Sequence, residues 1–179
     1  MTGILRFVGI MNAAIWLGGA VYFSFIAGQM PFASEMKSLL GNGFPYYSGA
    51  IAQIGISRYF SFHLICCVVA LAHLAAEWLY QERRNRTSLL WLMGALLGLT
   101  LVSGYWLQPK MKRLFAIKHA INYPQPAREA AAKSFGRWHG LSMTLNLFML
   151  GGLVIYTMHL TRPPEIARFV RPPGSKFRS

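Results

Sequence analysis

The sequence predicts an all-α integral membrane protein, a four-helix bundle with short interfacial helices in the first and third loops. Hydrophobic residues make up 54% of the 179 residues, and the mean hydropathy of +0.36 exceeds that of an ordinary soluble domain. Charged residues make up only 13% and fall between long uncharged segments. A bilayer favours this arrangement, because backbone polar groups in hydrocarbon must be satisfied within helices or closed barrels.

Four segments are long enough to cross the hydrocarbon core, which is about 30 Å thick and takes roughly 20 residues of helix. We expect these spans at residues 7–27, 59–79, 88–108 and 138–160, all within one domain of residues 1–160. The first should be a retained helix, since its apolar run exceeds that of a signal peptide. Residues 161–179 are expected to form a basic, proline-rich tail.

The connections between the spans predict how the helices are arranged. The stretch YQERRNRTS is short enough to make the second and third spans antiparallel neighbours. The first connection contains two short helical stretches punctuated by glycine and proline, and Pro45 is well placed to start the second of them. The third connection is helical on both sides of NYPQP, where two prolines interrupt the helix.

The formal net charge of +13 indicates the partners that the chain would attract. Lys and Arg are spread through the loops and tail, so anionic lipid headgroups are expected and nucleic acid is not. Gly94 and Gly98 have the small-xxx-small spacing that permits close helix packing inside the bundle, in a homo-oligomer or in a larger membrane complex. The tightest basic clusters lie in the second connection and the tail, which favours a multi-pass topology with both termini in the cytoplasm.

The composition excludes most of the catalytic sites that are found in soluble enzymes. The chain has no Asp, and its two cysteines, Cys66 and Cys67, are adjacent within an apolar segment and cannot form a disulfide framework. Motifs such as G-x-S-x-G, H-E-x-x-H and C-x-x-C are missing from the sequence. We therefore predict no catalytic residue and expect a protein that is not an enzyme.

The second span carries polar side chains along one face. At about 100° per residue, its polar and small residues fall within an arc of roughly 80°. Because polar groups in hydrocarbon are costly unless they are satisfied, this stripe should face the bundle interior. It consists of Tyr59, His63, Cys66, Ala70, His73 and Glu77.

Matching depth between antiparallel spans predicts two intramembrane polar clusters. The second and fourth spans run in the same direction, so polar residues near their starts should lie at the same depth in the membrane. The first span runs in the opposite direction, so polar residues near its start should lie at the same depth as those near the end of the second span. The first cluster is His63, His139, Ser142 and Asn146. The second cluster is Asn12, His73 and Glu77.

Each cluster has two interpretations. The polar groups either hold helices together at about 0.6–2 kcal/mol per contact or form a site. His63 and His139 are the best candidates for ligands of haem b or a metal ion, and His73 with Glu77 could relay a proton or hold a cation. His63 and His73 are roughly 15 Å apart along one helix and cannot share a metal ion.

Three stretches carry a family resemblance: NAAIWLGGAVYFSF, GAIAQIGISRYFSFHLICCVVALAHLAAEWLY and FGRWHGLSMTLNLFML. They resemble the transmembrane protein 205-like family, also described as domain of unknown function 4149, over about residues 6–160. The resemblance implies a four-helix membrane protein without an established activity. It also implies a remote likeness to the copper-resistance protein D and protoporphyrinogen oxidase group, some of which use haem. The histidine that the oxidase pattern places before its tryptophan is missing before Trp16.

Two functions therefore remain open. The first is a non-enzymatic accessory subunit, or a factor that handles a small solute or a metal, and it has no predicted cofactor. The alternative is a haem b-binding redox protein or oxidase that uses His63 with His139.

Overall fold

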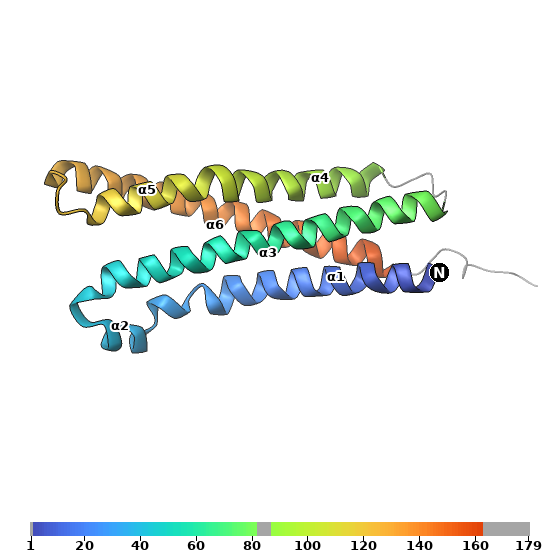
Figure 1. Cartoon of the computed structure of the whole chain (residues 1–179), viewed down its shortest axis with the longest axis horizontal. Coiled ribbons are helices and arrows are strands. Elements are labelled where there is room, and N and C mark those ends of the chain that lie inside the picture. Colours follow the sequence, from blue (N-terminus) through green and yellow to red (C-terminus); the bar gives the residue numbers. More distant parts are fainter. Residues whose placement is uncertain (1, 82–86, 163–179) are drawn as a thin grey trace, which may run out of the picture.

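The computed structural model describes residues 2–81 and 87–162, and these residues are almost entirely helical (Figure 1). The order of elements is α1 (Thr2–Tyr22), η1 (Phe23–Ala27), η2 (Met30–Phe32), α2 (Ser34–Leu40), η3 (Gly41–Gly43), α3 (Phe44–Gln81), α4 (Thr87–Leu101), η4 (Val102–Leu107), α5 (Gln108–His119) and α6 (Gln125–Thr161). The segments η1 and η4 are π-helical, whereas η2 and η3 are 3₁₀ turns.

The long helices form an antiparallel bundle. In Figure 1, α1, α3 and the α4–η4–α5 rod lie alongside one another, and α6 crosses behind them. The start of α1 and the end of α6 lie at one end of the bundle, where the Arg6 guanidinium donates a 3.1 Å hydrogen bond to the Arg162 carbonyl. The short helix α2 and the α5–α6 connection lie at the opposite end (Figure 1). The chain therefore forms an all-α bundle, as predicted.

The exterior of the bundle differs from that of a water-soluble bundle, and the mainly apolar core also contains polar side chains. Polar residues such as Asn12, His63 and Glu77 are buried. Large apolar side chains cover the outside of every long helix, including Phe7, Ile65, Trp91, Tyr105, Phe148 and Ile155. An apolar exterior of this extent is typical of a surface that contacts lipid.

Among the described residues, three helical stretches are long and apolar enough to cross a membrane: Gly3–Leu79, Thr87–His119 and Gln125–Thr161. The first stretch contains both α1 and α3, which are joined through η1, η2, α2 and η3. Length and composition thus identify apolar helices that fit a membrane protein.

Two helices are longer than the sequence indicated. The separate interfacial helix expected at Pro45 is instead the first part of α3, because no further proline lies between Pro45 and Tyr59 to interrupt it. In the same way, α6 begins at Gln125, directly after Pro124, and runs without interruption into the expected fourth span. Of the expected tail, only Thr161 and Arg162 belong to the described residues, and most of the second connection, residues 82–86, also lies outside them.

The π-helical segments have identifiable local causes. In η1, the Gly28 amide donates to the Phe23 carbonyl over 2.7 Å, a bond that spans five residues. A Cβ atom at Gly28 would lie only 2.9 Å from that oxygen, so glycine permits the wider turn. In η4, the widened turn directly precedes Pro109, whose ring would clash with the carbonyl four residues earlier in a regular helix.

The small residues of α4 do not make the close helix contact inside the bundle that was one of the predicted alternatives. A Cβ atom added at Gly94 or Gly98 would meet nothing within 4 Å. The close approach between α4 and α6 occurs instead at Gly152, where a Cβ atom would lie 2.8 Å from Leu96. Gly94 and Gly98 therefore mediate no tight packing among residues 2–81 and 87–162.

Candidate functional site

Trp16 and His63 connect α1 to α3 at the centre of the bundle. The indole Nε1 of Trp16 donates a 2.7 Å hydrogen bond to Nδ1 of His63, and the two side chains are 0% and 1% exposed. An indole nitrogen can only donate, so Nδ1 of His63 must be unprotonated and the neutral imidazole must carry its proton on Nε2. Within the described part of the chain, this buried Nε2 has no hydrogen-bond partner.

A second set of hydrogen bonds ties α3 to α6 and η1. The Tyr59 hydroxyl donates to Oδ1 of Asn146 over 2.8 Å, and Nδ2 of Asn146 donates to the Ser24 hydroxyl over 2.8 Å. Phe23 stacks on the Tyr59 ring with centroids 4.1 Å apart, and the Tyr59 ring in turn meets the His63 ring edge-on at 4.3 Å. Tyr59 thus joins the two hydrogen-bonded sets.

A cavity of about 970 Å³ lies beside these residues. It is lined by η1, η2, the first half of α3, the π-helical η4 and the middle of α6. The lining is mostly apolar and contains no Lys, Arg, Asp or Glu side chain among the described residues. Its polar members include Ser24, Gln53, Tyr59, His63, Ser103, Gln108, His139, Ser142 and Asn146.

The structure brings the first predicted cluster to one cavity but not into direct contact. His63, His139, Ser142 and Asn146 all belong to the lining. The hydrogen bonds described for His63 and Asn146 run to Trp16, Tyr59 and Ser24 rather than to each other. His139 is exposed and lies parallel to Phe135, with ring centroids 6.0 Å apart.

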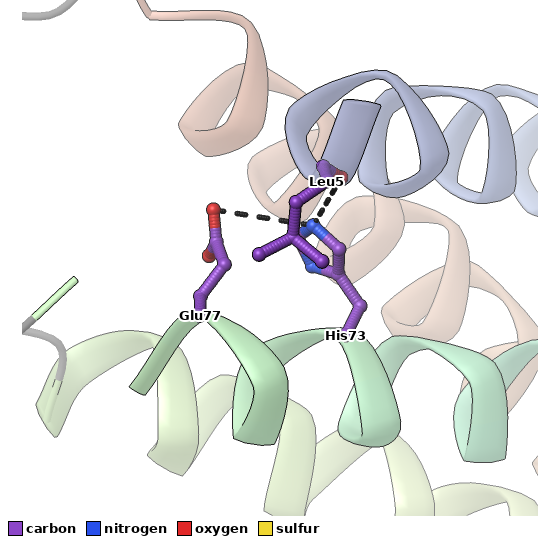
Figure 2. Close-up of polar contacts among 3 residues, drawn as sticks. All are labelled: Leu5, His73 and Glu77. Carbon is purple, nitrogen blue, oxygen red and sulfur yellow. Dashed lines mark hydrogen bonds and ion pairs between the residues drawn. The ribbon is translucent and has the colours of Figure 1, made fainter. Parts of the chain in front are cut away.

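The second predicted cluster is only partly assembled. Figure 2 shows His73 and Glu77 on α3 turned toward Leu5 on α1. The His73 ring hydrogen-bonds the Leu5 carbonyl through Nε2 at 2.8 Å, and the same nitrogen lies 3.9 Å from Oε1 of Glu77. A Cβ atom at Gly9 would lie 2.4 Å from the His73 ring, so the missing side chain lets the imidazole lie against the α1 backbone.

Asn12, the third predicted member, bonds elsewhere. Its Nδ2 donates to the Cys66 carbonyl over 3.0 Å, in the middle of α3. This bond lies between the level of His63 and the level of His73. Asn12 therefore ties α1 to α3 between the two clusters instead of completing the second.

The ring nitrogens of His63 do not have the arrangement of a haem or metal ligand. A ligating histidine offers one ring nitrogen to the metal and donates from the other, usually to a carboxylate or a carbonyl. In His63 the arrangement is reversed, because Nδ1 accepts from Trp16 and Nε2 carries the proton. Residues 2–81 and 87–162 also contain no group of three or more His, Cys, Asp or Glu side chains that could hold a metal ion.

Sequence reasoning missed several partners. It did not connect Trp16 with His63, and it gave Ser24 no role. The signal for Trp16 was present, because it follows Asn12 by four residues and so lies on the same face of α1. No comparable signal existed for Ser24, which lies within the π-helical η1.

Comparison with known proteins gives one match. A family model described as "Domain of unknown function (DUF4149)" matches residues 11–120, which include Trp16, Ser24, Tyr59 and His63. The match ends before α6, so it does not extend to the fourth-span pattern of His139, Ser142 and Asn146. No curated protein and no solved structure matches the chain.

Proposed function

Because the chain belongs to the DUF4149 family, whose description assigns no activity, we propose a function from the geometry of the cavity. The protein is a non-enzymatic membrane protein that binds a small apolar or amphipathic solute between α3, α6 and the two π-helical segments. The single observation that carries this proposal is the uncharged cavity of about 970 Å³ inside an otherwise strongly basic chain.

The proposal includes a topology of four spans, formed by α1, α3, α4 with η4, and α6. This arrangement places α2 and the α5–α6 connection on one side of the membrane and both termini on the other, in the cytoplasm. The exposed basic residues of α5, such as Lys112 and Arg113, would then face anionic headgroups. The same proposal groups the chain with the transmembrane protein 205-like proteins, which its sequence resembles.

Two further features support solute binding. The cavity volume lies at the upper end of the range of about 300–1,000 Å³ that small-molecule sites occupy. Both π-helical segments contribute lining residues, including Ser24 from η1 and Ser103 from η4. Single π-helical turns cost helix regularity and occur frequently at functional sites.

Filling the cavity tests the proposal. Ala52 lines the cavity, so Ala52→Phe should abolish saturable binding of a hydrophobic dye such as Nile red to the purified protein in lipid nanodiscs. Ala75→Phe is the matched control, because it makes the same change at an exposed position on the same helix and should leave binding intact. Equal binding by the wild type and the Ala52→Phe variant would overturn the proposal.

A further inference from the structure

We infer that the ligand is a single-chain amphiphile from the bilayer with a neutral head that carries hydroxyl groups, such as a monoacylglycerol. Its head binds between Gln53 of α3 and His139 of α6, and its chain points toward the middle of the bundle. The inference rests on the proposed function, since it names the class of molecule that the cavity selects and the direction in which that molecule lies.

The polar groups of the cavity that lie toward the middle of the bundle are closed to a ligand. Tyr59, His63 and Ser103 are all less than 9% exposed. The Tyr59 hydroxyl donates to Asn146, and Nε2 of His63 is buried without access from the cavity. The head of an amphiphile is therefore not expected at this end.

Accessible polar groups line the cavity nearer the end of the bundle that carries α2. Gln53 and Ser142 are half-buried, and His139 is exposed. Their side chains form no hydrogen bond with another described residue. The half-buried Gln108 donates from Nε2 to Ser57, which leaves its Oε1 as an acceptor. Both donors and acceptors are thus available in this part of the lining.

The alignment of α3 with α6 places these groups at a similar height. Both helices begin at the same end of the bundle (Figure 1), and the bond between Tyr59 and Asn146 joins them further along. At 1.5 Å per residue, Gln53 lies about 9 Å before Tyr59, and His139 lies about 10.5 Å before Asn146. Ser142 lies about 6 Å before Asn146 on the same helix. One head group can therefore be contacted from both helices.

The remainder of the cavity suits a hydrocarbon chain. From Gln53 to His63 the lining follows α3 for about 15 Å. Ile56 and Phe60 of α3 and Leu107 of η4 contribute apolar side chains along this length. A chain attached to the head therefore extends from the height of Gln53 toward His63.

The rim of the cavity belongs to the apolar exterior of the bundle. Phe25 and Met30 line the cavity from η1 and η2, and Met143 and Leu147 line it from α6. These four residues are 56–65% exposed. A molecule dissolved among the acyl chains of a bilayer can therefore enter between these segments, which favours a membrane amphiphile over a water-soluble solute.

The lining also determines which head group is favoured. No Lys, Arg, Asp or Glu among the described residues lines the cavity, so an ionised head would lose its hydration without a counter-charge. The exposed Lys112 is outside the lining, and its ammonium donates to Ser57. The amide of Gln53 and the neutral imidazole of His139 each offer a donor and an acceptor. A hydroxyl group, which also donates and accepts, matches them better than a carbonyl or an ether oxygen, which only accepts.

The experiment compares three probes with the same hydrocarbon chain: monoolein, its analogue with both hydroxyl groups methylated, and oleate. Displacement of Nile red from the wild-type protein in nanodiscs gives the affinities, after correction for partition of each probe into protein-free nanodiscs. Monoolein should bind about five- to tenfold more tightly than the methylated analogue, which corresponds to one hydrogen bond of about 1–1.4 kcal/mol. Oleate should bind more weakly than monoolein.

Two variants identify the residues that contact the head. Gln53→Leu and His139→Phe should each reduce the preference for monoolein and leave the affinity for the methylated analogue unchanged. His159→Phe is the matched control, because it makes the same change at an exposed position of α6 outside the cavity and should keep the preference. An unchanged preference in both Gln53→Leu and His139→Phe would overturn the assignment of the head site.

The direction of the ligand is measured on the wild-type protein, so it does not depend on the folding of a variant. Monoolein with a photoreactive diazirine at the end of its chain should label residues near Tyr59 or Leu150. A diazirine on the glycerol should label residues near Gln53 or His139. The reverse pattern of labelling would overturn the orientation.

The outcomes separate this inference from the proposed function. Equal affinities for monoolein and the methylated analogue, both lost in Ala52→Phe, would leave a solute-binding cavity and overturn recognition of a hydroxyl group. Tighter binding of oleate than of monoolein would overturn the neutral head. If no probe displaces the dye and Ala52→Phe binds the dye as the wild type does, both this inference and the proposed function are wrong.

Discussion

The indole N–H of Trp16 on α1 reaches Nδ1 of His63 on α3 over 2.7 Å, with both side chains closed to solvent. This contact determines which nitrogen of His63 carries a proton and therefore what the residue can do at the cavity. A neutral histidine held in this way carries its proton on Nε2 and accepts through Nδ1, so neither nitrogen offers a free lone pair to a metal ion.

The tautomer of His63 is the first prediction. In ¹⁵N spectra of the histidine-labelled protein, His63 should show an unprotonated Nδ1 and a protonated Nε2. The Trp16→Phe variant removes the donor and should give a mixture of both tautomers. A wild-type spectrum with the proton on Nδ1, or with both nitrogens protonated, would contradict the structural assignment. Added haemin should give no Soret spectrum that depends on His63.

The hydrogen bond between Tyr59 and Asn146 should contribute measurable stability. The Tyr59→Phe variant leaves the Asn146 carbonyl oxygen without this donor, and Asn146→Leu removes both of its bonds. A double-mutant cycle with unfolding in mixed micelles should give a coupling energy of about 0.6–1.7 kcal/mol, the range seen for interhelical hydrogen bonds in membranes. Additive effects of the two substitutions would show that this bond does not stabilise the bundle.

Close contact between Gly9 and His73 gives a third prediction. The new methyl group in Gly9→Ala would lie 2.4 Å from the His73 ring, so the ring must move and its bond to the Leu5 carbonyl should weaken. We expect destabilisation of about 1–3 kcal/mol, as in other overpacked sites. Gly18→Ala on the same helix is the control, because its Cβ atom would meet nothing within 4 Å. Equal stability of the two variants would be inconsistent with this packing.

The proposed topology can be tested with single added cysteines. Cys66 and Cys67 are buried and can stay in place, with the wild type as the background control. Leu39 and Ile121 are 78% and 95% exposed at the same end of the bundle, so Leu39→Cys and Ile121→Cys should react with an impermeant maleimide from the same side of sealed vesicles.

Thr161→Cys reports on the opposite end of the bundle. It lies at the end of α6, close to the start of α1, and should react only from the cytoplasmic side. Labelling of Leu39→Cys and Thr161→Cys from one side would rule out the four-span arrangement.

The period of the second span was enough to predict which of its residues are buried. Every member of the predicted stripe, from Tyr59 to Glu77, is less than 9% exposed, because a helix fixes the angular position of each residue from its number alone. Composition likewise predicted an all-α chain with apolar helices, since lipid leaves few alternatives for the backbone.

Comparing the depths of residues on different helices predicted their partners less accurately. It assigned His63 and Asn146 to one level, and both line the same cavity. It also joined Asn12 to His73 and Glu77, whereas Asn12 bonds the Cys66 carbonyl. The position of a residue along its helix axis follows from its residue number, but an error of about one helical turn in this position is enough to change the predicted partner.

Only the tertiary structure decided which side chains meet. Ser24 reaches Asn146 from within η1, and a π-helical turn shifts every following residue relative to a regular helix. His63 meets Trp16 because α1 and α3 cross with those faces together. Sequence determines the angle and height of a residue on its own helix, whereas partners depend on how separate helices rotate, cross and locally unwind against one another.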